Sequence, residues 1–405
     1  DEKIDLSIEI AAREKMLLEP LDYDRGYSLY VGIPFCPTTC LYCSFTSYPI
    51  SKWKGRTGLY LEALFKEMEY VADKMKGRPL DTIYFGGGTP STLTGMQLSE
   101  IMEALYKNFH ISDQAEITME MNPCDMTEEY LANARRLGIN RLSVGVQSHN
   151  DYLLKAIDRR HDSKAAEEAV KRAYRLGFHN ISIDLMYELP GQTPLDFEKS
   201  LKWAVHLPIN HLSVYSLIIE NGTKFGQMAE RGILKRPTEE ESWEMYQMMC
   251  RILPHYGLER YEISSFARKG YRSRHNLKYW DLSHYLGLGP AACSRIGHAR
   301  KENNPGVRLY EKEVLSGNLP PEEVENLSVK DEMEEYCFLH LRTREGIPLQ
   351  DFEERYGFPI EHWFGREIAM LKERKLLKES LGHLFMTYHG AALGNFVFEQ
   401  FIIDE

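Results

Sequence analysis

The chain has 405 residues, of which 43% are hydrophobic and 27% charged, as in a globular protein with room for two or three domains. Its 60 acidic residues outnumber 49 basic residues, and the net charge of −11 argues against a nucleic-acid binder with a broad basic face. The sequence shows no run of about 18 apolar residues and no opening signal-peptide pattern, and three of its seven cysteines are clustered, so we expect a cytoplasmic protein without stable membrane insertion.

Short β-type runs alternate with helical patterns from about residue 28 to residue 265. We predict strands at 28–33, 82–85, 116–121, 141–146, 181–187 and 211–217. We predict helices near 61–75, 96–108, 127–137, 163–176, 194–206 and 239–255. Strand and helix repeated at intervals of about 30 residues indicate a parallel sheet with right-handed crossovers. The expected fold class is therefore α/β, a partial (β/α)6 TIM-like barrel with its chemistry in the loops after the strands.

The pattern changes after about residue 310. Helical stretches near 328–342, 349–356 and 362–377 precede a turn-rich hairpin, which predicts a small helical, winged-helix-like domain. Mixed charge on its third helix favours a packing or lid role over DNA reading. We predict an N-terminal extension at 1–27, a barrel at 28–305 and a C-terminal cover domain at 306–405.

Three cysteines occur within eight residues of "CPTTCLYCSF", directly after the first predicted strand. Cys36, Cys40 and Cys43 have the spacing C-x3-C-x2-C. A structural zinc site would need a second close pair of ligands, and a thioredoxin-type site needs only two cysteines that precede a helix. Three thiolates on a loop can instead hold three irons of a [4Fe–4S] cluster and leave the fourth iron open. We predict such a metal site at these three residues.

The segments "GIPFC", "GGGTP", "DLMYELPGQTP" and "HNLKYW" accompany the cysteine motif. Together they resemble the radical SAM superfamily, in the group of oxygen-independent coproporphyrinogen III oxidase and coproporphyrinogen dehydrogenase. That group has haem chaperones and anaerobic haem-modifying enzymes among its relatives. The resemblance covers nearly the whole chain from residue 28 and implies S-adenosyl-L-methionine bound at the open iron.

The resemblance also implies which residues bind the cofactor. It places the methionine moiety against two glycines of "GGGTP", and it gives Tyr30, Gln147 and Arg159 additional catalytic roles. Asp184 is a lone acid in an apolar strand, where an unpaired carboxylate is costly, so ligand contact and a structural ion pair both remain open. The expected cofactor-binding residues are Tyr30, Tyr42, Gly87, Gly88, Thr89, Glu120, Gln147, Arg159 and Asp184.

A tetrapyrrole contact is expected in "SRHNLKYW", residues 273–280. His275 is either an axial haem ligand or a satisfied structural histidine. Arg272 and Arg274 are better placed for propionates, because guanidinium matches carboxylate in a bidentate fashion.

Four positions depart from the pattern of the group. Gly32 stands where relatives often have histidine, Glu188 where they have glycine, and Cys293 in "GPAACS" where histidine or glycine is frequent. Phe45 takes the last position of the C-x3-C-x2-C-x-C motif found in relatives with decarboxylase chemistry, as it does in the chaperone branch. The cluster should be unaffected, but decarboxylase activity becomes less certain.

Taken as a whole, the resemblance implies an oxidoreductase of porphyrin biosynthesis. Our leading expectation is the oxidative decarboxylation of coproporphyrinogen III propionates to vinyls, which forms protoporphyrinogen IX. The main alternative is a haem-binding chaperone of the same fold, and a third is a radical haem methyltransferase with ring opening. A flavodoxin- or ferredoxin-type electron donor is implied as a partner, and no nucleic acid is expected.

Overall fold

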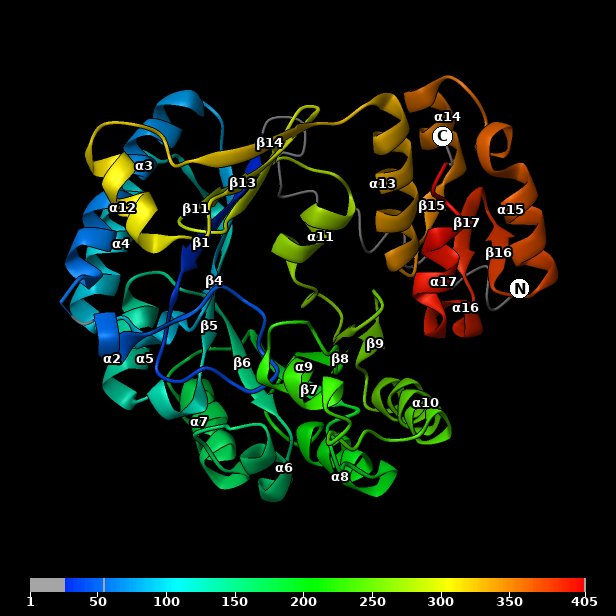
Figure 1. Ribbon diagram of the computed structural model, residues 1–405, viewed down its shortest axis with the longest axis horizontal. Helices are drawn as coiled ribbons and strands as arrows, with labels where there is room; N and C mark the ends of the chain where they lie inside the picture. Colours follow the sequence, from blue (N-terminus) through cyan, green and yellow to red (C-terminus); the bar gives the residue numbers. More distant parts are fainter. Residues whose placement is uncertain (1–25, 54, 404–405) are drawn as a thin grey trace.

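The computed structural model describes residues 26–53 and 55–403, so the predicted N-terminal extension lies almost entirely outside the described residues. A large α/β lobe and a smaller, mostly helical lobe lie side by side (Figure 1). Within the described ranges, no helix combines the length and the apolar character that crossing a bilayer requires.

Six neighbouring parallel strands form the centre of the large lobe, which confirms the expected barrel-like α/β fold. All six predicted strands are present within a few residues of their expected bounds. In spatial order they are β1 (Tyr27–Ile33), β4 (Leu80–Gly87), β5 (Ile111–Met121), β6 (Arg141–Gln147), β7 (Ile181–Tyr187) and β8 (His211–Ser216).

Helices follow these strands and cover the outside of the sheet (Figure 1). Several begin at a capping box, in which a threonine hydroxyl and the side chain three residues later satisfy exposed backbone N–H groups. The covering helices are α3 (Thr57–Lys74), α4 (Gly95–Asn108), α5 (Glu128–Arg136), α7 (Ser163–Arg175), α8 (Pro194–Ala204) and α10 (Glu239–His255).

The central strands alternate between apolar and polar side chains. In β6, Leu142 and Val144 are buried in the core under the helices, whereas Ser143 and Gly145 line a cavity on the other face. Because successive side chains of a strand point to opposite faces, this alternation gives the barrel a polar interior. The site described below lies on that face.

Short strands extend the sheet at both edges. Next to β1 lie β11 (Tyr285–Leu288), β12 (Cys293–Ile296), β13 (Ala299–Asn303) and β14 (Glu322–Asn326), and next to β8 lie β10 (Ser265–Ala267) and β9 (Glu259–Arg260). Helix α12 (Val307–Leu315) packs on α3. Helix α12 and strand β14 thus pack with the large lobe, although they follow the boundary expected at residue 306.

The smaller lobe has a hydrophobic core of its own. Three helices and a three-stranded sheet in the order β15-β17-β16 match the predicted winged-helix-like arrangement, and two short helices follow them. Its elements are α13 (Val329–Arg342), β15 (Ile347–Pro348), α14 (Leu349–Tyr356), α15 (Glu361–Glu373), β16 (Leu377–Ser380), β17 (His383–Met386), α16 (Tyr388–Ala392) and α17 (Gly394–Glu399).

Candidate cluster and cofactor site

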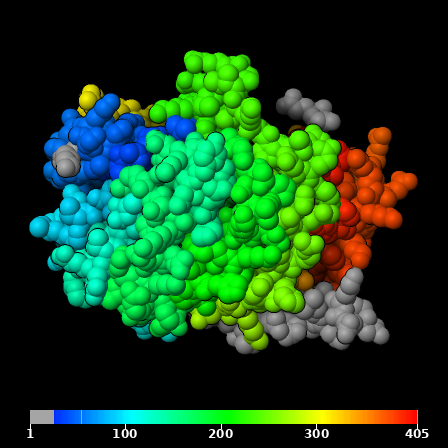
Figure 2. All heavy atoms as spheres, turned by 90° about the horizontal axis from the view of Figure 1, so that it is seen from below, coloured from blue at the N-terminus to red at the C-terminus, as the bar shows by residue number. Residues whose placement is uncertain are grey.

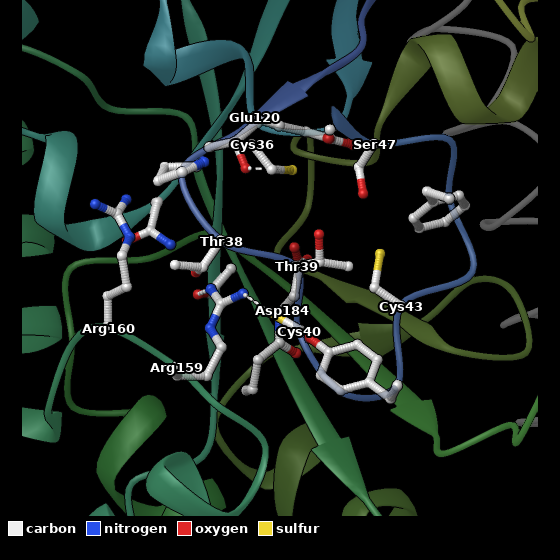
Figure 3. Close-up of a pocket in the computed structure, with 18 of the residues that line it drawn as sticks. Cys36, Thr38, Thr39, Cys40, Cys43, Ser47, Glu120, Arg159, Arg160 and Asp184 are labelled. Atoms are coloured by element: carbon white, nitrogen blue, oxygen red, sulfur yellow. Dashed lines mark hydrogen bonds between the residues drawn. The ribbon is translucent and has the colours of Figure 1, made fainter. Parts of the chain in front are cut away.

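A cavity of about 390 Å³ opens at the carboxyl ends of the parallel strands. Its wall combines the three clustered cysteines with most of the cofactor residues expected from the sequence (Figure 3). These are Cys36, Cys40, Tyr42, Cys43, Gly87, Gly88, Thr89, Glu120, Gln147, Arg159 and Asp184.

The cysteine loop is anchored at both ends and in the middle. It leaves β1 through β2 (Phe35–Cys36) and returns through β3 (Tyr48–Pro49), which pair with each other. In the middle, the backbone of Leu41 donates to the carbonyl of Ile157 and accepts from the N–H of Phe225 at 2.9 Å. These partners follow α6 (Asp151–Ala156) and belong to α9 (Lys224–Glu230). The loop is therefore fixed by two segments remote in the sequence.

Glycine allows the loop after β4 to approach the cysteines. Gly87 has φ +109, a conformation that favours glycine, and a Cβ there would meet the carbonyl oxygen of Ile33 at 2.9 Å. A Cβ on Gly88 would meet the sulfur of Cys36 at 3.0 Å. Beside them, the Thr89 hydroxyl and the Cys36 sulfur form a hydrogen bond of 3.2 Å. The "GGGTP" segment is thus packed directly against one predicted cluster ligand.

Burial controls the protonation of the thiols. It raises the pKa of Cys36 to about 11, while the hydrogen bond from Thr89 lowers it, and burial also raises the pKa of Cys43. Thiolates are the metal-binding form of cysteine, so cluster assembly here must displace protons.

Two acidic side chains face the cavity from β5 and β7. Burial raises the pKa of Glu120 to about 7, against a hydrogen bond of 2.8 Å from the hydroxyl of Tyr84. Burial raises the pKa of Asp184 to about 6, against a hydrogen bond from Ser213 and the charges of two arginines. The cavity therefore holds two carboxyl groups whose ionised form a bound cation would favour.

Gln147 and Arg159 meet at the end of β6. Gln147 has φ 73 at a register shift between Gly145 and Gln147, which is a β-bulge that redirects its side chain. A guanidinium nitrogen of Arg159 contacts the sulfur of Cys40 at 3.5 Å, and another donates to the carbonyl of Gly145. The Nε of Arg159 is buried without a hydrogen-bond partner among the described atoms, so it remains available to a ligand.

Tyr30 does not line the cavity, contrary to its expected cofactor contact. Its ring is stacked on Tyr84 at 6.1 Å between centroids, and a Cβ on Gly86 would meet the same ring. Tyr30 therefore lies behind the wall that the cofactor would touch.

The expected tetrapyrrole residues are also engaged elsewhere. His275, on α11 (Arg274–Trp280), is 1% exposed, and its two ring nitrogens bond to the hydroxyls of Thr82 and Tyr279 at 2.7 and 2.8 Å. Burial lowers its pKa to about 3, and the charges of Arg141 and Lys278 lower it further. The described conformation thus fits the structural alternative for His275 and offers neither nitrogen to haem iron.

The two arginines beside it bind protein groups. Arg272 pairs with Glu345 at 3.2 Å, and Arg274 donates to the carbonyl of Gln114 at 2.8 Å. Neither lines the cavity, so a propionate contact by these two arginines stays a prediction.

The departures from the family pattern have local explanations. A Cβ on Gly32 would lie 3.2 Å from the carbonyl oxygen of Leu288, so a larger side chain at position 32 would be too close to β11. Glu188 has φ 65, which explains why glycine is common there, and it pairs with Arg236 at 3.1 Å. Cys293 is exposed on β12 and does not line the cavity. Phe45 does line it, with 73% of its surface exposed.

Sequence reasoning missed several residues of the cavity wall. Ser143 and Gly145 on β6 and Met186 on β7 occupy the same face as Gln147 and Asp184, at every second position. The signal was in the alternation "RLSVGVQ" and "ISIDLMY", because small and polar residues recur among apolar ones with the period of a strand. The other missed lining residues are Pro37, Thr38, Thr39, Ser47, Met121, Asn122, Asp158, Arg160 and Tyr215.

The C-terminal domain does not cover the cavity. No described residue after Tyr215 lines it, because the domain packs against α11 and against β9, β12 and β13 at the side of the barrel. The expected cover role is therefore not seen in this conformation.

The donor set fits a [4Fe–4S] cluster with S-adenosyl-L-methionine. Three thiols lie on one loop, carboxyl groups and an unsatisfied guanidinium nitrogen face the same space, and glycines permit close approach. Among the described residues, no three His, Cys, Asp or Glu side chains converge closely enough to hold a single metal ion.

Two family models match the chain. Residues 30–204 match the Radical SAM superfamily, and residues 327–393 match the HemN C-terminal domain. The chain is 37% identical to "Heme chaperone HemW" of Bacillus subtilis over 93% of this chain and 99% of that protein. It is 34% identical to the protein of the same name from Escherichia coli, over 93% and 98% of the two chains.

A solved structure resembles the whole molecule. Coproporphyrinogen III oxidase (HemN) from Escherichia coli, described as a radical SAM enzyme, superposes with a TM-score of 0.81 at 25% identity. The match covers 96% of this chain and 93% of that chain. The fold is thus shared with an oxidase, whereas the sequence is more similar to proteins named haem chaperones.

Proposed function

We propose that this chain, which belongs to the HemN-like group of the radical SAM superfamily, is a haem-binding chaperone that works in the cytoplasm. The observation that carries the proposal is the similarity to haem chaperones over nearly the full length of both chains. Phe45, in place of the extra cysteine of decarboxylating relatives, supports it. Coproporphyrinogen decarboxylation, our leading expectation from the sequence, has less support, because the oxidase is only 25% identical.

The family's cofactors are a [4Fe–4S] cluster and S-adenosyl-L-methionine, which together supply one-electron chemistry when bound. We assign the cluster to Cys36, Cys40 and Cys43. Glu120 would neutralise the cofactor's positive charge, and the unpartnered Nε of Arg159 would bind its carboxylate.

We infer that haem binds at the mouth of the cavity. Phe45 and Tyr215 line this mouth and are 73% and 42% exposed, so two aromatic faces are presented to solvent beside the cysteine loop. Large exposed aromatic groups at a cavity mouth suit a flat apolar ligand. Arg160, also in the lining, would meet a propionate, although it already pairs with Asp125 at 2.9 Å.

The test compares two ligands on anaerobically reconstituted protein. We expect one equivalent of haem to bind, seen as a Soret band, and added coproporphyrinogen III to remain unchanged. Formation of protoporphyrinogen IX with matching amounts of 5′-deoxyadenosine would favour the decarboxylase instead, and a methylated or linear tetrapyrrole the third alternative.

A variant tests the placement of haem. Phe45→Ala should weaken haem binding by about ten-fold, which corresponds to roughly 1.4 kcal/mol of lost aromatic contact, while the iron content stays constant. Tyr152→Ala is the matched control, because Tyr152 is 72% exposed on α6 but does not line the cavity. Equal haem affinity in wild type and Phe45→Ala would exclude the mouth as the site.

A further inference from the structure

We propose that a second surface of the barrel docks an acidic one-electron carrier, which delivers the electron that the cluster needs. The inference rests on the proposed cluster. We call this surface the Trp53 face, and it consists of Lys52, Trp53, Arg56, Leu59, Arg308 and Leu309.

The Trp53 face is linked to the cluster by adjacent aromatic rings. Phe35 is the residue before the ligand Cys36 and is completely buried. Its ring lies 6.3 Å from that of Trp53, between centroids. Trp53 ends α2 (Ile50–Trp53) and is half-buried, so one indole reaches from the neighbourhood of a cluster ligand to solvent. This is a short path of packed rings between the protein surface and the predicted metal site.

Basic groups surround this indole. The guanidinium groups of Arg56 and Arg308 lie over the Trp53 ring at 5.8 and 5.5 Å, and Lys52 is exposed in the same turn. Glu311 is buried and offsets the charge of Arg56, so Lys52 and Arg308 supply the positive charge that remains. Of the carboxylates one turn away, Glu62 on α3 is exposed and Glu313 on α12 pairs with Lys312. In a chain of net charge −11, a local basic surface marks a partner of the opposite sign.

The face also has the composition of a protein interface. Leu59 on α3 and Leu309 on α12 are exposed large hydrophobic residues, and these two helices pack against each other. Figure 2 shows the blue atoms of the early chain and a small yellow group from the region of α12 side by side at one edge of the molecule. Aromatic, arginine and apolar groups with a charged rim are typical of protein–protein contacts rather than of bare surface.

The transfer itself is simple. One electron leaves the carrier, which is oxidised by one equivalent, and enters the cluster, which is reduced by one equivalent. No bond is made or broken, so the face has to supply only proximity and charge complementarity. A small protein with an acidic surface around its flavin or iron–sulfur centre meets both requirements.

The experiment uses a purified acidic bacterial flavodoxin and the whole chain. Affinity is measured for the cluster-free protein with oxidised flavodoxin, and the rate of cluster reduction by reduced flavodoxin is followed by the bleaching of the cluster absorbance. In Lys52→Glu/Arg308→Glu we expect both affinity and the bimolecular rate to fall about ten-fold at low salt, and the wild-type values to fall as salt rises. Lys269→Glu, an exposed change elsewhere on the barrel, is the matched control.

The outcomes separate this inference from the proposed function. Reduction by dithionite and haem binding should be the same in all variants, because neither uses the Trp53 face. If the double variant loses its cluster on purification, Arg308→Gln replaces it. We then expect a smaller fall in the affinity for flavodoxin and in the rate of cluster reduction. Binding and reduction rates unchanged within two-fold, independence from salt, or self-association through this face would each overturn the inference.

Discussion

Glu120 has an unusual environment for an acidic residue. It faces the cavity, accepts a hydrogen bond from Tyr84, and lies near the second carboxyl group, Asp184. Because burial raises its pKa to about 7, the folded protein binds a proton there that the unfolded chain releases near pH 4.5. The ionised form of Glu120 is therefore unfavourable in the empty protein at neutral pH, and it becomes favourable when a cation occupies the cavity.

The pH dependence of stability tests this view of Glu120. The folded state holds more protons than the unfolded state between about pH 4.5 and 7, so the free energy of unfolding of the cluster-free protein should fall as pH rises through that window. In Glu120→Gln the fall should be smaller, and the affinity for S-adenosyl-L-methionine should drop. Thermal denaturation from pH 5 to 8 measures the first effect. Glu62→Gln is the exposed control, and identical pH profiles for Glu120→Gln and wild type would refute the assignment.

The site was only partly predictable at the scale of single residues. The motif residues around the cysteines could be assigned to the site from the sequence, because each of them belongs to a short continuous motif. The surroundings of Tyr30 and His275 could not be foreseen, because motif positions do not reveal which face of a strand or helix is covered. His275, for example, stacks on Tyr84 at 5.0 Å between ring centroids and bonds to the hydroxyl of Thr82, and both contacts join α11 to β4, an element far away in the sequence.

Among the helices, α3 ties the barrel edge together through one buried carboxyl group. Glu67 accepts hydrogen bonds from the backbone N–H of Gly289 at 2.8 Å, the amide of Asn303 at 2.9 Å and the hydroxyl of Tyr310 at 2.6 Å. These donors lie after β11, at the end of β13 and on α12. One side chain therefore satisfies polar groups from three further segments.

Replacing Glu67 should destabilise the protein strongly. Glu67→Ala removes the acceptor of three buried donors, of which only the Asn303 amide keeps another partner, the carbonyl of Gly289, and we expect a loss of about 3 kcal/mol in the free energy of unfolding. Glu67→Gln retains one acceptor oxygen, so its loss should be about half as large. Denaturant unfolding measures both. A loss below about 1 kcal/mol for Glu67→Ala would contradict the role of this group.

The elements themselves were largely predictable from the sequence. The six parallel strands and six covering helices have strong periodic patterns, and threonine caps mark several helix starts. Strands β13 and β14, "ARKEN" and "EEVEN", were not predicted, because charged edge strands have no apolar alternation. They are specified by pairing across the sheet, β13 with β12 and β14 with β13, which a local pattern does not contain.

At the scale of the whole molecule, ion pairs join the two lobes. Glu335 on α13 contacts Arg295 of β12 and Arg300 of β13, and its side chain is 7% exposed. Further pairs between the lobes are Arg272–Glu345, Arg344–Glu259 and Arg342–Glu262. Ion pairs therefore help to hold the C-terminal domain at the side of the barrel, together with the ring contacts of Tyr388 with Trp243 and Tyr246.

Glu335→Gln should loosen this attachment. Removing the Glu335 carboxylate leaves the buried Arg295 uncompensated, at a cost of roughly 3 kcal/mol, while Arg300 keeps its pair with Glu325. Hydrogen exchange should become faster in α13 and the rest of the C-terminal domain, while the cavity residues stay protected. Glu332→Gln is the control, since its partner His298 is 81% exposed. Unchanged exchange in α13 would mean that the apolar contacts alone hold the domain.

The central claim is that three cysteines hold a cluster whose fourth iron is left for S-adenosyl-L-methionine. The most direct measurement is the electron paramagnetic resonance spectrum of the reduced, reconstituted protein with and without this cofactor. We predict a [4Fe–4S] signal that changes shape when the cofactor is added, that is lost in Cys36→Ala, Cys40→Ala and Cys43→Ala, and that persists in Cys293→Ala. A signal indifferent to the cofactor, or one that also disappears with Cys293, would contradict the account.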